Sequence, residues 1–176
     1  MKKRFALGFI LGISGFLPAF AQTTEESSLP AVRFPEKVTA VDGREVDVKQ
    51  LATAKTLVVV TLKATWCKVC QRQLMRIKKR LSESEACGVS YLVLAPGPRK
   101  QLLEIQKKIK FPFPFIEDTD LRIAKSLGLQ MSEDEILPAI FILTGDLKVG
   151  WMQAGRSDLN YGDPALFEKV KCADWI

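Results

Sequence analysis

The sequence predicts an α/β domain in which helices flank a central mixed β-sheet. Two runs of apolar and β-branched residues, 56–63 (TLVVVTLK) and 89–95 (VSYLVLA), are typical of strands that are buried on both faces of a sheet. A basic stretch with apolar residues at helical spacing follows each run. A third apolar segment, 139–155, predicts an antiparallel hairpin. Strands that alternate with helices and end in a hairpin indicate this fold class.

Turn and cap residues separate the expected elements. Asp42-Gly43, flanked by alternating apolar residues, is a strong hairpin signal, Gly128 ends a short helix, and Asp163-Pro164 starts a last one. In chain order we expect two short strands around 42–43, a strand over 56–63, a helix from the cysteines to about 81, a strand over 89–95, a helix over 102–109, a short helix over 118–128, a hairpin turning at 144–146 and a helix from 163 to about 171.

The first 21 residues have the layout of a secretory signal peptide. Three basic residues precede an apolar run that ends in the small-x-small site Ala19-Phe20-Ala21. An uncleaved membrane anchor is the alternative, although a spanning helix is weakened by Gly12, Gly15 and Pro18. We therefore expect a signal peptide over 1–21, a flexible leader over 22–33 and one domain over 34–176. Export indicates an oxidising compartment such as a bacterial periplasm, where disulfides persist.

The charge does not indicate a nucleic-acid partner. The chain has 26 Lys and Arg, 20 Asp and Glu, and no His. Cleavage after Ala21 removes three basic residues (Lys2, Lys3 and Arg4) and no acid, so the formal net charge falls from +6 to +3. We expect the basic runs at 78–80, 99–100 and 107–110 to be solvated helix faces rather than a binding patch.

Cys67 and Cys70 stand two residues apart where a buried strand passes into a helix. Haem attachment needs a His after the second Cys, and position 71 is Gln. A zinc site needs about four ligands, and the exported copper(I) carriers of this architecture usually add a His to two thiolates, so the sequence argues against a metal. An inert structural disulfide is the alternative to redox exchange, but a pair at this junction is poorly placed to staple a long segment.

Redox exchange needs a partly exposed thiolate. Unpaired N–H groups and the dipole at a helix N-terminus lower the pKa of a thiol there. We therefore expect Cys67 to be the nucleophile and Cys70, one turn later and shielded by the chain, to be the resolving thiol, with no cofactor besides this pair.

These residues resemble the thioredoxin superfamily. Trp66-Cys67-Lys68-Val69-Cys70 is similar to its W-C-x-x-C active site, and Leu137-Pro138-Ala139 to its cis-proline loop. The segments VDGREVDVKQL and FPFPFIEDTDLRIAKSLGL resemble the exported TlpA-like and redoxin (AhpC/TSA-like) branch. The resemblance covers about 34–172. It implies a thioredoxin-like fold with an N-terminal β-hairpin, a strand–helix insertion between the CxxC pair and the cis-proline, and thiol–disulfide exchange with protein substrates.

The resemblance also implies roles for neighbouring residues. Trp66, Leu137 and Pro138 would contact the substrate, with Pro138 in a cis bond that offers strand-like hydrogen bonds. Two cations, Lys63 and Lys68, would stabilise the Cys67 thiolate, whereas the acidic segment 132–135 would oppose them, and the sequence leaves the net effect open.

The thioredoxin-like topology further implies a second disulfide. It brings Cys87 and Cys172 to the same end of one sheet face, and we expect them to pair as a structural bridge. Two separate buried thiols are the alternative.

Two positions depart from the resemblance. The Asp that thioredoxins bury six residues before the first Cys is Thr61 here, and the Glu that TlpA-like proteins often place three residues after the second is Gln73. The usual proton acceptor for Cys70 is therefore absent from both places. Water, Lys63 or a more distant carboxylate has to take that role.

Three functions remain. The first is an exported thiol–disulfide oxidoreductase that acts on protein substrates together with a redox partner protein. We expect it to be a monomer that contacts a membrane only if its N-terminal segment is uncleaved. The second is a redoxin-type thiol peroxidase, but its signature needs Pro seven and Thr three residues before the Cys, where Val60 and Ala64 stand. The third is a non-catalytic binding module such as a metallochaperone. We expect the first.

Overall fold

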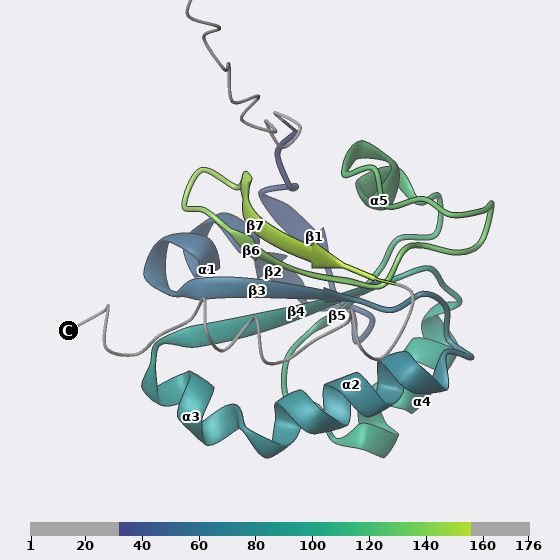
Figure 1. Cartoon of the computed structure of the whole chain (residues 1–176), viewed down its shortest axis with the longest axis horizontal. Coiled ribbons are helices and arrows are strands. Elements are labelled where there is room, and N and C mark those ends of the chain that lie inside the picture. The colour runs from purple at the N-terminus through teal and green to yellow at the C-terminus, as the bar shows by residue number, and fades with distance from the viewer. Residues whose placement is uncertain (1–31, 156–176) are drawn as a thin grey trace, which may run out of the picture.

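A five-stranded mixed sheet forms the centre of the protein (Figure 1). The computed structural model describes residues 32–155. The strand order is β5-β4-β3-β6-β7. The strands are β3 (Thr56–Thr61), β4 (Val89–Ala95), β5 (Phe115–Glu117), β6 (Ala139–Leu143) and β7 (Val149–Ala154). The first three are mutually parallel, whereas β6 is antiparallel to both β3 and β7, which confirms the predicted mixed sheet.

Helices cover both faces of this sheet. One face carries α2 (Lys68–Lys79), α3 (Leu81–Ala86) and α4 (Arg99–Ile109). The other carries α1 (Val48–Ala54), α5 (Arg122–Ser126) and the antiparallel hairpin of β1 (Lys37–Thr39) and β2 (Glu45–Asp47). The result is a three-layer α/β fold with the sheet in the middle.

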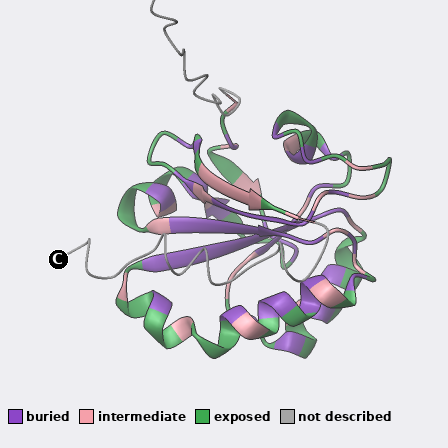
Figure 2. Ribbon diagram, viewed as in Figure 1, coloured by how far each residue is buried: buried purple, intermediate pink, exposed green. Residues whose placement is uncertain are grey.

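The central strands are buried on both faces because their side chains alternate between two cores. Val58 and Val60 of β3 pack with the apolar sides of α2 and α4. Leu57 and Val59 pack with α1, α5 and the N-terminal hairpin. Figure 2 shows these strands buried while the helices expose their outer sides. Burial on both faces is why the sequence runs are apolar without interruption.

Some helices differ from those predicted. The helix after the cysteines, α2, ends at Lys79 with Arg80 as its C-cap, and α3 follows it as a separate segment. Helix α1 was not predicted, because seven residues carry too short a periodic pattern. Its local signal is Asp47, whose side chain accepts a hydrogen bond from the backbone N–H of Gln50 at 2.7 Å and caps the helix.

Several predictions concern residues that lie outside 32–155. These are the signal peptide, most of the leader and the last helix from residue 163, and they stay predictions. Within the described part of the chain, no helix has the length and apolarity needed to cross a membrane.

Candidate active site at the start of helix α2

Cys67 and Cys70 form a disulfide at the first turn of α2. Their Cα atoms are 5.4 Å apart. Cys67 is the N-cap of the helix, and its sulfur accepts the backbone N–H of Cys70 at 3.2 Å. Strand β3 ends six residues earlier, so the junction between a buried strand and a helix places both sulfurs at the sheet edge.

The two sulfurs differ in their surroundings. Cys67 keeps 7% of its surface exposed, whereas Cys70 keeps none. The sulfur of Cys70 also lies 3.4 Å from the backbone nitrogen of Lys63. This difference in exposure supports Cys67 as the attacking sulfur, and the assignment of the two roles stays a prediction.

Lys63 connects the cysteines to a loop that is distant in the sequence. Its Nζ lies 3.1 Å from Oε2 of Glu135 and 4.9 Å from the ring centroid of Trp66. Its backbone carbonyl accepts the N–H of Ile136 at 3.1 Å. The acidic segment 132–135 thus reaches Lys63, and a carboxylate partly offsets this cation beside the cysteines.

The sequence indicated the acidic segment 132–135 as a whole but did not single out Glu135. Neither position expected to hold a proton acceptor has a carboxylate. Gln73 is fully buried and its Oε1 accepts a hydrogen bond from Arg76, while Gln71 donates from Nε2 to the carbonyl of Thr65 at 2.8 Å. The position of 132–135 just before Pro138 was the one signal that pointed to Glu135.

Trp66 and Lys68 flank Cys67 on the surface. Trp66 is 58% exposed, and with Met75 it is one of the two large apolar side chains exposed among residues 32–155. Lys68 is exposed on the first turn of α2. Both lie where a substrate bound at Cys67 would meet them, so their predicted roles in substrate contact and thiolate stabilisation stay open to test.

The predicted cis bond at Pro138 is wrong. Within residues 32–155 the cis peptide is Gly97–Pro98, and the Leu137–Pro138 bond is trans. The N–H of Leu137 donates to the carbonyl of Leu129 at 2.6 Å, and its own carbonyl accepts the hydroxyl of Thr61 at 2.8 Å. The backbone groups that a cis-proline loop would offer to a substrate are therefore used inside the protein.

Thr61 explains this arrangement. Its buried hydroxyl also accepts the N–H of Ala139 at 2.6 Å, so one side chain satisfies backbone groups on both sides of Pro138. Pro138 is itself buried and Leu137 is half-buried. Their contact with a substrate stays a prediction, to be made through side chains rather than through the backbone of Leu137.

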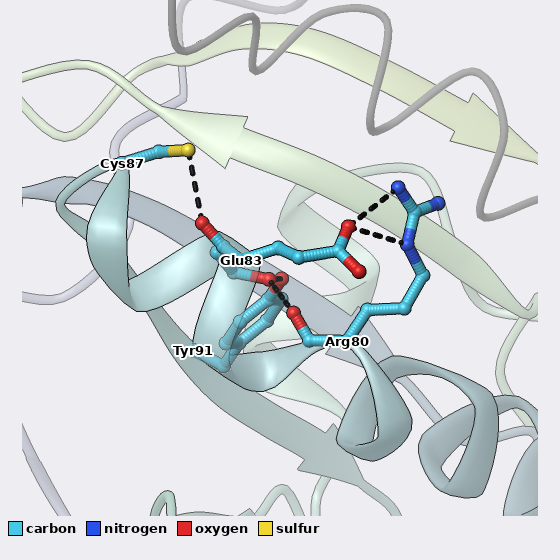
Figure 3. A network of polar contacts seen from close by, with 5 residues as sticks. Arg80, Glu83, Cys87 and Tyr91 are labelled. Atoms are coloured by element: carbon cyan, nitrogen blue, oxygen red, sulfur yellow. Dashed lines mark hydrogen bonds and ion pairs between the residues drawn. The ribbon is translucent and has the colours of Figure 1, made fainter.

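Cys87 lies away from this site, at the end of α3 (Figure 3). It is half-buried, and its sulfur is 3.0 Å from the carbonyl oxygen of Glu83, whose carboxylate pairs with Arg80. The nearby hydroxyl of Tyr91 donates to Ser84 at 3.0 Å. The predicted partner, Cys172, lies outside the described residues, so the second disulfide stays a prediction.

Over residues 32–155, no group of three or more His, Cys, Asp or Glu side chains is placed to hold an ion. The chemistry that the described site can perform is thiol–disulfide exchange at Cys67 and Cys70.

Comparison with known protein families places the chain. Residues 28–152 match the family described as AhpC/TSA. The chain belongs to the AhpC/TSA family. It is therefore a thiol-based oxidoreductase of the redoxin group with a thioredoxin-like fold, as the sequence predicted. A comparison with curated protein sequences found no match.

Solved structures with the same fold include peroxidases and a disulfide oxidoreductase. Peroxiredoxin Q of Xanthomonas campestris aligns with a TM-score of 0.69 at 18% identity, over 82% of this chain and 94% of that one. Peroxidoxin BcpB of Mycobacterium tuberculosis gives 0.68 at 12%, over 77% and 90%. A secreted M. tuberculosis disulfide oxidoreductase described as homologous to E. coli DsbE gives 0.60 at 16%, over 76% and 92%. At these identities the likeness shows the fold alone.

Proposed function

We propose that this redoxin is exported from the cytoplasm and, outside it, exchanges electrons with thiols and disulfides of other proteins. The observation that carries the proposal is the Cys67–Cys70 disulfide, closed within the first turn of α2 with Cys67 at the helix N-cap and the exposed Trp66 beside it. A reversible dithiol at a solvent-accessible helix N-terminus is the arrangement that disulfide exchange needs.

The exchange has two steps. In the reducing direction the Cys67 thiolate attacks one sulfur of a substrate disulfide, that bond breaks, and one substrate thiolate leaves. Cys70 then loses its proton and attacks the Cys67 sulfur, which releases the second substrate thiolate. Two electrons pass from the Cys67–Cys70 dithiol to the substrate, and the reverse sequence oxidises a substrate dithiol.

The protein contributes charge and position to these steps. The free N–H groups of the first turn of α2 and the positive end of its dipole stabilise the Cys67 thiolate. Burial of Cys70 keeps an external disulfide away from it and directs its attack to Cys67. Glu135 pairs with Lys63, whose backbone nitrogen lies 3.4 Å from the sulfur of Cys70, so this pair brings a carboxylate near the cysteines.

Peroxide reduction is the second candidate, because the chain belongs to the AhpC/TSA family and shares the fold of peroxiredoxin Q. The described residues argue against it. Val60 and Ala64, at the positions where the peroxidase signature needs Pro and Thr, are buried apolar residues. The hydroxyl of the adjacent Thr65 already contacts Oε1 of Gln101 at 2.5 Å.

One set of parallel assays separates these functions. The reduced protein is tested for reduction of insulin disulfides, for consumption of hydrogen peroxide and an alkyl hydroperoxide, and for copper(I) binding. We expect insulin reduction that Cys67→Ser abolishes and peroxide consumption near background. Peroxide turnover that exceeds disulfide exchange and disappears in Cys67→Ser would establish the peroxidase instead. Copper(I) binding without either activity would establish the binding module.

A further inference from the structure

Helices α2 and α4 together carry the positive excess of the chain. α2 has five basic residues and no acidic one, and α4 has four basic residues and one acidic one. Nine of the 26 basic residues and one of the 20 acidic residues are thus on these helices, which leaves 17 basic against 19 acidic residues elsewhere. The sequence alone suggested separate solvated helix faces, because it does not show that the two helices are neighbours.

The fold brings both helices to the active site. β3 and β4 are parallel and adjacent, and α2 and α4 follow the carboxyl ends of these strands. Both helices therefore start at the sheet edge that holds Cys67, and they run side by side across one face (Figure 1). We use the term basic face for the exposed basic side chains of these two helices, which are Lys68, Arg72, Lys78, Lys79, Arg99, Lys100, Lys107 and Lys108.

A hollow of about 590 Å³ separates the two helices next to Trp66. Trp66 and Ile105 supply apolar surface in its lining, Lys68 and Lys108 supply positive charge, and Glu104 is its one acidic group. Such a lining suits a polypeptide segment, which presents both apolar and charged side chains.

Two contacts join α4 and its C-terminal residue to α2 and the loop before it. At the active-site end the Thr65 hydroxyl lies 2.5 Å from Oε1 of Gln101, and further along Lys78 donates from Nζ to the carbonyl of Ile109 at 2.8 Å. The eight residues from Gln101 to Lys108 span roughly 10 Å of helix, enough for about three residues of extended chain. The hollow is thus sized for a short segment that begins beside Cys67.

We propose that the hollow and the basic face dock an acidic segment of the substrate protein, next to the cysteine that reacts with Cys67. This inference rests on the proposed function, since it names the substrate class of the same site. Complementary charge speeds encounter and disfavours basic partners, so it acts on the second-order rate constant more than on the chemical step.

The test compares three disulfides in single-turnover reactions of the reduced protein, followed by tryptophan fluorescence. Two are synthetic peptides of equal length that carry an intramolecular disulfide next to either three Asp or three Lys residues. The third is the small neutral bis(2-hydroxyethyl) disulfide. We expect the acidic peptide to react at least about tenfold faster than the basic one at low salt, with the preference shrinking as salt rises.

Charge reversal on α4 locates the effect. Lys108→Glu and, separately, Lys100→Glu should each lower the rate with the acidic peptide by about threefold or more and leave the neutral disulfide unchanged. The matched control is Lys55→Glu, an exposed lysine at the end of α1 on the opposite face of the sheet, which should change the acidic-peptide rate much less. Two variants at different ends of α4 are used so that misfolding of one of them does not decide the result.

Each outcome has one meaning. Equal rates for the two peptides, or equal effects of Lys108→Glu and Lys55→Glu, would overturn the docking inference while reduction of the neutral disulfide upholds the proposed function. Failure of the wild type to reduce any of the three disulfides would overturn the proposed function itself. If Lys108→Glu keeps its peptide rates but loses binding to anionic lipid vesicles, the basic face serves a membrane and the docking inference is wrong.

Discussion

At the scale of single residues, Lys63 holds the site together. Its backbone N–H faces the sulfur of Cys70, its carbonyl accepts the N–H of Ile136, and its ammonium group pairs with Glu135 over the ring of Trp66. The pair is partly exposed, with 27% and 23% of the two side chains accessible, so water screens it. Such a pair contributes little to the stability of the fold, and the effect of Lys63 on the Cys67 thiolate stays a prediction.

Removal of either charge should shift the pKa of the Cys67 thiol, in opposite directions. Lys63→Gln removes a nearby cation and should raise this pKa, whereas Glu135→Gln leaves that cation uncompensated and should lower it, each by up to about one unit. The ultraviolet absorbance of the thiolate as a function of pH measures the shift in the reduced protein. The matched control is Glu133→Gln, an exposed neighbour. Shifts of the same sign in both variants would contradict the assignment.

At the scale of elements, the start of α2 gives the two cysteines different surroundings. Cys67 caps the helix and is reachable from solvent, while Cys70 is one turn further in and fully buried. The first turn has no acidic residue that would oppose a thiolate there. We therefore predict that this strand–helix junction activates Cys67 and protects Cys70.

The roles of the two cysteines predict which variant traps substrates. Cys70→Ser leaves a nucleophile without a resolving thiol, so mixed disulfides with substrate proteins should accumulate and disappear on treatment with dithiothreitol. Cys67→Ser should trap several-fold fewer partners, because Cys70 is buried. Non-reducing gels of affinity-purified variants measure the adducts. Equal trapping by the two variants, or the reverse order, would refute the assignment.

At the scale of the whole molecule, the fold joins a redox site to a charged surface. Parallel pairing of β3 and β4 sends α2 and α4 away from the same edge, so the reactive sulfurs and the basic face are neighbours. The opposite face, with α1, α5 and the N-terminal hairpin, closes the second core. Under the docking proposal, a substrate that approaches Cys67 would contact Trp66 and the basic face together.

Export is the prediction that concerns the chain as a whole. Expressed in full length in a Gram-negative host, the protein should appear in the periplasmic fraction with Gln22 as its first residue, because cleavage is expected after Ala21. Peptide mapping by mass spectrometry without reduction should then also find Cys87 linked to Cys172. A chain that starts at Met1 and sediments with membranes would show an uncleaved anchor, and free thiols at Cys87 and Cys172 would remove the second disulfide.

The sequence by itself determined the features that depend on neighbouring residues. Apolar runs identified β3 and β4, the Asp42-Gly43 turn identified the hairpin of β1 and β2, and the spacing of Cys67 and Cys70 at a strand–helix junction indicated redox chemistry. These signals are local, because side-chain periodicity, turn preference and a helix N-terminus act over a few residues.

Only the tertiary structure decided which distant groups meet at the site. It brought Glu135 to Lys63, made the Leu137–Pro138 bond trans with Thr61 satisfying the backbone around it, and set α4 beside α2. Each of these contacts joins segments separated by tens of residues, and no local pattern encodes such a contact. Packing around the sheet determines which of many possible partners a charged group or a hydroxyl contacts. The acidic segment was therefore predicted from the sequence, whereas its contact with Lys63 was not.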